Sequence, residues 1–181
     1  EQHLQELPTR CYGTYGMTET VSHIALREIN GERKSSAYFA LGKVSFSTDE
    51  RGCLVINTPH LQQQRFITND IVRLVDTTHF EWLGRHDNVI NSGGVKLFPE
   101  SIEARIASFL SQRFFITAED DCRLGQKAVL VIESLPWDEA ECQQLLSRLK
   151  SCLPPYEVPK NIYFQEHLTE TYSGKIVRKI K

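Results

Sequence analysis

The sequence predicts an α+β protein in which a β-rich first part is followed by a small part that contains both helices and strands. Three observations support this prediction. Short β-rich runs dominate up to Gly84, turn residues separate these runs, and helical stretches appear only beyond that point. The 181 residues suffice for one domain or two small ones, and an apolar content of 40% with 24% charged residues is typical of globular proteins.

The first part contains a series of candidate strands, which we expect to form a small antiparallel sheet or a partial barrel. Each is a run rich in apolar and β-branched residues, and polar turns such as Asp49-Glu50-Arg51-Gly52 separate them. The expected strands cover residues 11–15, 23–28, 43–47, 54–57, 71–75 and 80–83.

The second part is expected to begin with a β-hairpin. Its apolar runs, Val89-Ile90 and Val95 to Leu97, flank Ser92-Gly93-Gly94, and a glycine pair supplies the positive φ angles that a tight turn needs. Pro99 favours the first turn of a helix, which we expect over residues 99–112. Strands at 114–118, 127–133 and 161–165 and a second helix at 138–152 complete the expected elements.

Charge and cysteine content exclude several classes of function. The formal charge of −2 provides no basic field for nucleic acid. The five cysteines contain no Cys-x-x-Cys pair, which argues against a disulfide framework and a zinc site, and a reducing cytoplasm suits them. No stretch approaches the roughly 20 apolar residues of a transmembrane helix. We therefore expect a cytoplasmic protein that binds neither nucleic acid nor membrane.

Three segments carry motifs in a distinctive order: Tyr15-Gly16-Met17-Thr18-Glu19, Gly84-Arg85-His86-Asp87, and Ser173-Gly174-Lys175-Ile176-Val177-Arg178. Together they resemble the carboxyl-terminal motifs of the acyl-adenylate-forming enzymes, the superfamily of acyl-CoA synthetases, peptide-synthetase adenylation domains and luciferases. Secondary matches lie at residues 121–125 and 153–159. The resemblance thus covers nearly the whole chain.

The resemblance implies a domain organisation. Residues 1–84 would be the β-rich carboxyl-terminal part of the large adenylating domain, and residues 85–181 the small mobile carboxyl-terminal domain of the acyl-CoA synthetase type. Asp87 falls at the hinge position, where a change in φ and ψ swings the small domain between two poses. Family members carry a phosphate loop upstream of these motifs, so we expect this chain to be the last third of a larger enzyme and inactive without the amino-terminal part.

The resemblance also implies roles in a reaction that uses MgATP to activate a carboxylic acid and then transfers the acyl group to CoA. Lys175 would be the catalytic lysine of the first step; the alternative is a solvated lysine in a basic tail. Thr18 would hydrogen-bond the α-phosphate, and Glu19 would hold Mg²⁺. Tyr15 and Gly16 would belong to the nucleotide site, with the Tyr15 ring against the adenine.

Further residues match the ribose and CoA sites of the family. Asp70 would accept hydrogen bonds from both ribose hydroxyls, and Arg85 would also reach the ribose. Asn69 replaces the glycine that the family has before this aspartate, and asparagine tolerates left-handed φ better than most residues. The hairpin turn, Ser92-Gly93-Gly94, would let the pantetheine arm of CoA pass along the backbone; a hairpin with no ligand is the alternative.

The amino-acid sequences of two segments, 15–25 and 87–97, are similar to those of the o-succinylbenzoate–CoA ligases of menaquinone biosynthesis. This similarity implies o-succinylbenzoate as the acid substrate. Ser22 and His23 would then line the acid pocket, although two polar residues at a strand rim are an equal alternative. Two other functions stay open: an adenylation domain that loads a carrier protein, and a non-catalytic interaction module with the same fold. A homodimer is among the open oligomeric states.

Overall fold

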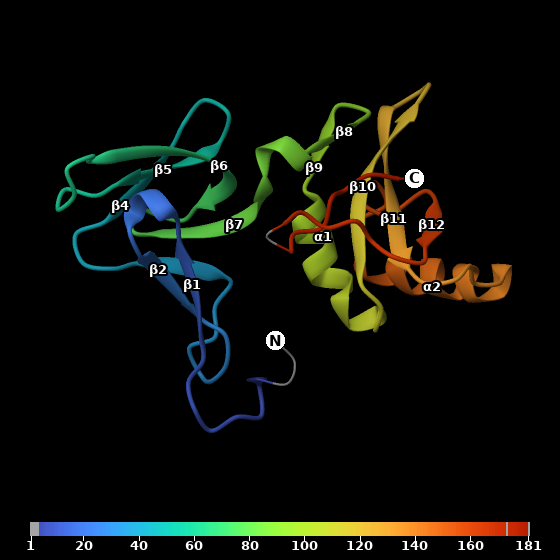
Figure 1. Cartoon of the computed structure of the whole chain (residues 1–181), viewed down its shortest axis with the longest axis horizontal. Helices are drawn as coiled ribbons and strands as arrows, with labels where there is room; N and C mark the ends of the chain where they lie inside the picture. The colour runs from blue at the N-terminus through green and yellow to red at the C-terminus, as the bar shows by residue number, and fades with distance from the viewer. Residues whose placement is uncertain (1–3, 173, 181) are drawn as a thin grey trace. The chain divides into compact units, whose positions relative to one another are not determined.

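The computed structural model describes residues 4–172 and 174–180. It divides the chain into two compact units, Glu1–His86 and Asp87–Lys181, which we call unit 1 and unit 2 (Figure 1). The division falls two residues beyond the boundary expected from the sequence. That unit 1 belongs to an adenylating domain and that unit 2 is a mobile domain stay predictions.

Unit 1 is built on one antiparallel sheet, as its sequence predicts (Figure 1). Seven strands of the described chain lie in the order β1-β2-β3-β7-β6-β5-β4. Their bounds are β1 Tyr12–Gly16, β2 His23–Glu28, β3 Ala37–Ala40, β4 Ser45–Thr48, β5 Cys53–Asn57, β6 Arg65–Leu74 and β7 His79–Arg85.

The sheet of unit 1 curls around an aromatic core. Phe80 of β7 lies with its ring centroid 5.1 Å from that of Tyr15 in β1 and 4.8 Å from that of Phe46 in β4. Tyr38 of β3 stacks on the same Phe80 ring at 5.4 Å. Strands from both ends of the sheet order therefore meet across one interior, which brings β1 close to the middle strands β7 and β6.

Two strands of unit 1 depart from the expectation. β3, a four-residue strand with no fully buried side chain, was not expected from the sequence. β6 was expected to begin at Ile71, whereas the strand begins at Arg65 and continues through Asn69 and Asp70. Both polar residues disfavour strands by propensity, but the pairing of β6 with β5 and β7 on its two sides overrides that preference.

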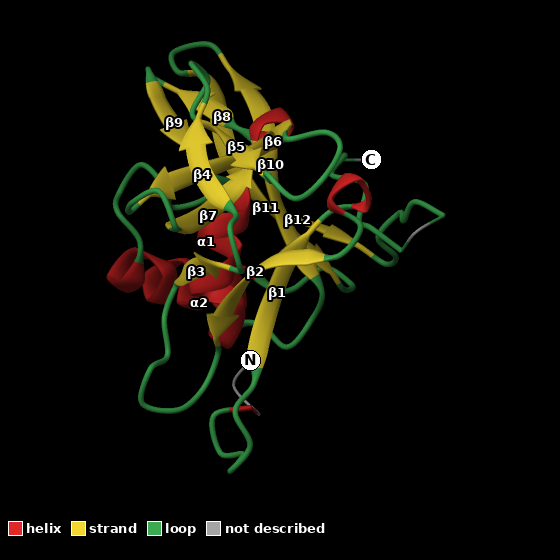
Figure 2. Ribbon diagram, turned by 90° about the vertical axis from the view of Figure 1, so that its left-hand side faces the viewer, coloured by secondary structure: helices red, strands yellow, loops and turns green. Residues whose placement is uncertain are grey.

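Unit 2 combines a mixed sheet with two α-helices (Figure 2). Its strands follow the order β10-β11-β8-β9, and β12 pairs with β11 in parallel. The bounds are β8 Ile90–Ser92, β9 Val95–Leu97, α1 Pro99–Ile106, β10 Phe114–Asp121, β11 Gly125–Glu133, α2 Glu139–Cys152 and β12 Ile162–Gln165.

The expected first helix is too long at its carboxyl end. α1 ends at Ile106, and a 3-10 turn, η4 (Ala107–Phe109), follows it. Leu110 is already extended, with φ −129° and ψ 128°, and its side chain is buried in the core. Burial of this leucine in an extended conformation therefore ends the helical segment before residue 112.

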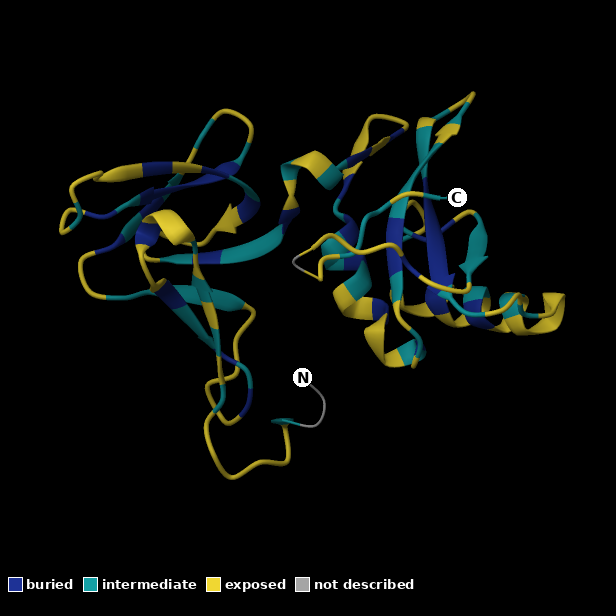
Figure 3. Cartoon of the chain, in the orientation of Figure 1, coloured by how far each residue is buried: buried dark blue, intermediate teal, exposed yellow. Residues whose placement is uncertain are grey.

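The two faces of the unit 2 sheet are covered differently, because alternate side chains of a strand point to opposite faces. Ile116 and Leu130 pack in one cluster with residues of both helices, including Ile102 and Leu149. On the other face lies a second cluster, which joins the sheet to the segment after β12: Phe115, Val131, Tyr163, Leu168, Ile176 and Ile180. The buried band along β10 and β11 in Figure 3 lies between these two layers.

None of the helices in the described part of the chain combines the length and the apolarity that crossing a bilayer requires.

Candidate functional site

The loop after β1 is held by a close backbone approach and a buried threonine. A Cβ added at Gly16 would lie 2.6 Å from the Ser22 carbonyl oxygen, so only glycine fits beside the start of β2. Thr20 is buried, and its hydroxyl donates to the carbonyl oxygens of Met17 and Ser22, each at 2.9 Å. The backbone N–H of Met17 donates to the same hydroxyl at 3.1 Å. Gly16 was expected in the nucleotide site from the sequence, whereas no role was expected for Thr20.

The loop that Gly16 and Thr20 hold in place exposes two expected site residues to solvent. Thr18 and Glu19 form the 3-10 turn η2 (Thr18–Thr20), and both are exposed. Val21 follows with φ +66° and ψ −37°, and the Ser22 N–H donates to the Thr20 carbonyl across it at 2.7 Å. This is a γ-turn of the strained positive-φ kind, and a β-branched residue there is costly. The loop therefore stores strain beside its exposed polar groups.

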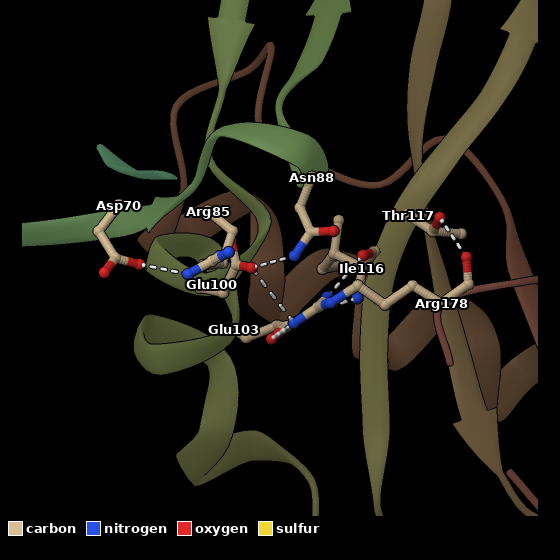
Figure 4. Close-up of polar contacts among 8 residues, drawn as sticks. All are labelled: Asp70, Arg85, Asn88, Glu100, Glu103, Ile116, Thr117 and Arg178. Atoms are coloured by element: carbon tan, nitrogen blue, oxygen red, sulfur yellow. Dashed lines mark hydrogen bonds and ion pairs between the residues drawn. The ribbon is translucent and has the colours of Figure 1, made fainter. Parts of the chain in front are cut away.

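Three expected nucleotide-site residues come together in unit 1. The Tyr15 hydroxyl of β1 donates to Asp70 Oδ2 at 2.6 Å, and Arg85 Nη1 of β7 donates to Asp70 Oδ1 at 3.2 Å. Figure 4 shows the second of these contacts. The Asp70 side chain is only 13% exposed, whereas that of Arg85 is 46% exposed. The curl of the sheet therefore assembles residues that lie 15 and 55 positions apart in the sequence.

The chemistry of this trio suits a hydroxyl-bearing ligand. Burial, followed by the hydrogen bond to Asp70, raises the pKa of the Tyr15 hydroxyl well above its ordinary value, so it stays a donor. A carboxylate has about four acceptor directions, and Tyr15 and Arg85 use two of them. Asp70 thus keeps acceptor capacity for further donors. The Tyr15 ring packs edge-on against Tyr38 and Phe80, which fixes its orientation.

His23, one of the two expected acid-pocket residues, lines a concave region of unit 1. The pocket has a volume of about 280 Å³, and Lys43 and His60 contribute to its wall with Ile24, Leu41, Gly42 and Val44. Ser22 lies beside it, with its Oγ 3.1 Å from His23 Nδ1. An apolar wall with three nitrogen-bearing side chains can accept an anionic or polar group.

The expected CoA hairpin forms in unit 2 between β8 and β9. Gly93 and Gly94 have φ angles of +58° and +83°, and both are exposed. Ser92 is buried and pairs with Gly125 of β11, while the Gly93 N–H donates to the Leu124 carbonyl at 2.8 Å. The glycines are thus accessible to a ligand on a turn that β11 supports, whereas the Ser92 side chain is not.

Lys175 lies in a tight turn of the terminal segment of unit 2. Its N–H donates to Thr171 Oγ1 at 3.1 Å, and its carbonyl accepts from the Thr171 N–H at 2.8 Å. Gly174 has a φ of +75°, which suits glycine, and Ser173 lies outside the described residues. The Lys175 side chain is exposed, so the turn presents its ammonium to solvent.

Asp87 is exposed in the 3-10 turn η3 (His86–Asn88), directly after the division between the units. Within residues 4–172 and 174–180, no group of three or more His, Cys, Asp or Glu side chains has metal-binding geometry. A single carboxylate, that of Glu19, is still compatible with Mg²⁺ binding, because that ion commonly takes one or two carboxylates and completes its shell with substrate phosphates and water. Glu100, Glu103 and Arg178, for which no individual role was expected from the sequence, form a partly buried cluster in unit 2.

Comparison with known proteins shows what the chain is similar to. No family model matches the chain. A 2-succinylbenzoate–CoA ligase of Lactococcus lactis is 29% identical over 193 residues, which cover 97% of this chain and 42% of the relative. A solved acyl-CoA synthetase (AMP-forming)/AMP-acid ligase II-like protein from Dyadobacter fermentans is 41% identical, with 98% of this chain and 51% of that one covered and a TM-score of 0.50. The chain resembles the carboxyl-terminal part of an AMP-forming acyl-CoA synthetase.

Comparison with solved structures shows the fold of the chain. The o-succinylbenzoate–CoA synthetase of Bacillus subtilis, solved with its acyl-adenylate intermediate, superposes with a TM-score of 0.76 at 19% identity, over 98% of this chain and 42% of that one. The fold predicted from the sequence is therefore confirmed. The chain spans about two fifths of the length of the Lactococcus relative.

Proposed function

We propose that this chain forms the carboxyl-terminal part of an ATP-dependent acid–CoA ligase that makes an acyl-adenylate and transfers the acyl group to CoA. The observation that carries the proposal is the convergence of Tyr15, Asp70 and Arg85. Each was assigned to the nucleotide site from a separate motif, and one carboxylate joins all three. Motifs that match by chance have no physical reason to converge in this way.

Unit 1 contributes nucleotide binding in this proposal. The carboxylate of Asp70 accepts hydrogen bonds from ribose hydroxyls, and Arg85 adds a donor beside it. Thr18 donates to the α-phosphate from the exposed turn that Thr20 fixes. Glu19 would hold Mg²⁺, which supplies positive charge to the phosphate oxygens of ATP when bound.

The first half-reaction joins the acid to AMP. A carboxylate oxygen of the acid attacks the α-phosphorus, and the bond from that phosphorus to the pyrophosphate oxygen breaks. Lys175 donates from its ammonium to the attacking carboxylate and the bridging oxygen as negative charge develops, a contribution of about 10²–10³ in rate for one such donor.

The second half-reaction transfers the acyl group to CoA. The thiol sulfur attacks the acyl carbon, the bond to the AMP oxygen breaks, and the thiol proton is released. The exposed Gly93 and Gly94 let the pantetheine arm approach the backbone. Asp87 acts as the hinge that exchanges Lys175 for this hairpin between the two half-reactions.

For the acid, we propose o-succinylbenzoate. This compound carries a second carboxylate besides the one that is activated, and the pocket of His23, Lys43 and His60 offers donors for it. The likeness to the Lactococcus ligase supports the same substrate class. Ser22 supports the His23 ring through the contact at 3.1 Å.

The test is mass-spectrometric detection of AMP and acyl-CoA from the full-length enzyme that carries this sequence, given MgATP, CoA and a panel of o-succinylbenzoate, benzoate and medium-chain fatty acids. We expect o-succinylbenzoyl-CoA as the main product, and no product from residues 1–181 alone. Adenylate that forms without acyl-CoA would replace CoA by a carrier protein as the acceptor. The absence of any adenylate would contradict the proposal and favour an interaction module.

A further inference from the structure

The terminal segment that carries Lys175 is attached to unit 2 at several points beyond its own turn. Ile176 and Ile180 pack against the sheet face formed by Phe115 and Val131. The Val177 N–H donates to the Thr169 carbonyl at 2.8 Å. These contacts hold the backbone on both sides of Arg178, three residues after the lysine.

The guanidinium of Arg178 contacts the strand β10 and two carboxylates on α1. Its Nη2 donates to Glu103 Oε2 at 2.9 Å, and its Nη1 donates to Glu103 Oε1 and to the Ile116 carbonyl, the latter at 2.9 Å. Glu100 Oε1 lies 3.8 Å from Nη2. Thr117 Oγ1 also donates to the Arg178 carbonyl at 3.3 Å, so both the side chain and the backbone of the arginine are held (Figure 4).

The same carboxylates connect to the segment at the hinge position. Asn88, the last residue of η3, donates from Nδ2 to Glu100 Oε1. Glu103 Oε1 in turn accepts from the Ile116 N–H at 2.6 Å. α1 therefore links the residue next to Asp87 with the strand β10 and with the terminal segment (Figure 4).

The cluster has the properties of a rigid anchor rather than of a surface ion pair. Only 21% of the Arg178 side chain, 18% of that of Glu103 and 11% of that of Glu100 are exposed. Burial opposes the charged form of the arginine, but the hydrogen bonds and the charge of Glu103 outweigh it and raise the pKa of Arg178. A planar guanidinium satisfies the paired carboxylate oxygens and a carbonyl together, which the single ammonium of a lysine cannot do.

The position of the anchor in the chain gives it a functional consequence. Lys175 has an exposed side chain, and within the described residues its ammonium makes no hydrogen bond or ion pair that fixes it. Its placement therefore depends on its backbone, which the Thr171 turn holds on one side and Arg178 on the other. A displacement of about 1 Å at a reacting group costs on the order of 100-fold in rate.

We propose that Arg178 is a positioning residue for Lys175: the partly buried cluster of Arg178, Glu103, Glu100 and Asn88 fixes the terminal segment on unit 2 and connects it to the segment next to Asp87. The inference rests on the proposed function, in which Lys175 acts in adenylation only. Loss of the anchor should therefore slow the first half-reaction and spare the second.

The experiment separates the two half-reactions in the full-length enzyme. Adenylation is followed by pyrophosphate release, and thioester formation by acyl-CoA production from synthetic acyl-adenylate and CoA. The variants are Arg178→Lys, which keeps the charge, and Glu103→Gln, which keeps the shape of the carboxylate. Arg123→Lys is the matched control, because it makes the same change at an exposed residue between β10 and β11.

We expect Arg178→Lys to slow adenylation by about 10- to 100-fold while thioester formation changes by less than about 2-fold. Glu103→Gln should also slow adenylation more than thioester formation, and Arg123→Lys should change neither step. An equal loss of rate in both half-reactions would show that the cluster only stabilises unit 2, and this would overturn the inference. Unchanged adenylation in Arg178→Lys would overturn it as well.

Hydrogen exchange on the 181-residue chain tests the anchor without catalysis. Arg178→Lys should speed amide exchange in residues 174–180 and leave β11 unchanged, and unaltered exchange would overturn the anchoring role. If the unsubstituted full-length enzyme makes no adenylate, the proposed function fails. Exchange then decides the anchoring inference by itself.

Discussion

Replacing Asp70 by asparagine is expected to destabilise unit 1 by about 1–2 kcal/mol. The Tyr15 hydroxyl donates to Asp70 Oδ2 at 2.6 Å inside the curl of the sheet. A hydrogen bond to a charged group contributes about 1.5–3 kcal/mol and one between neutral groups about 0.5–1.5 kcal/mol, so the neutral amide forfeits about 1–1.5 kcal/mol. The Arg85 contact adds only a few tenths, because 46% of that side chain is exposed and solvent screens the pair.

The two tryptophans of the chain allow unit 1 to be measured separately. Trp82 lies in β7 of unit 1, and Trp137 precedes α2 in unit 2. In a Trp137→Phe background, the fluorescence of Trp82 reports urea unfolding of unit 1. Glu50→Gln is the matched control, because it makes the same carboxylate-to-amide change at an exposed turn residue of unit 1. We expect the control to change stability by less than about 0.5 kcal/mol.

A double-mutant cycle isolates the contact between Tyr15 and Asp70. Tyr15→Phe removes the hydroxyl with little change in shape, and the double variant shows whether the two losses overlap. We expect a coupling energy of about 1 kcal/mol. Additive losses, or an Asp70→Asn variant as stable as Glu50→Gln, would refute the reasoning that this hydrogen bond holds the trio together.

Three further substitutions test the loop after β1 and the acid response of unit 1. Gly16→Ala should lower stability by about 1–3 kcal/mol in urea unfolding, because the new Cβ would lie 2.6 Å from the Ser22 carbonyl oxygen; a neutral result would contradict the close approach. Val21→Gly should raise stability by about 0.5–1 kcal/mol by relieving the φ of +66°, and a loss would show that the turn is unstrained. Ser36 donates to Glu81 and is the main cause that lowers the pKa of this carboxyl. Stability from a depressed pKa is present above the unfolded-state pKa and is lost as the pH falls through the folded value, so Ser36→Ala should lower Tm at about pH 6 and converge with the parent near pH 3. A difference independent of pH would contradict this assignment.

Much of the fold could be predicted because the elements follow local patterns. The glycine pair at 93–94 predicted the hairpin, and both glycines have positive φ in the structure. The second helix was expected over residues 138–152; α2 buries Leu145 and Leu149, and its Asp138 N-cap accepts from the Glu141 N–H. The order of strands in each sheet could not be derived from local pattern, since it depends on pairings between distant segments.

The site residues show where local reasoning ends. Tyr15, Asp70 and Arg85 were found by motif, but their convergence depends on the curl of the sheet around Phe80. Arg178 is the last residue of the motif that begins at Ser173, but no role was expected for it, and Lys179 and Lys181 make the terminal segment look like a solvated basic tail. Its partial burial depends on two carboxylates one turn apart on α1, and the nearer of these in sequence, Glu103, lies 75 positions earlier. Contacts of such separation require the folded chain.

The central claim is that Lys175 supplies the cation for acyl-adenylate formation, and one comparison tests it most directly. Adenylation by the full-length enzyme is measured for Lys175→Ala and for Lys179→Ala, which removes an exposed lysine four residues later in the same segment. The account predicts that Lys175→Ala loses about 10²–10³ in the rate of adenylate formation and that Lys179→Ala stays near the parent rate. Equal rates in the two variants would contradict it.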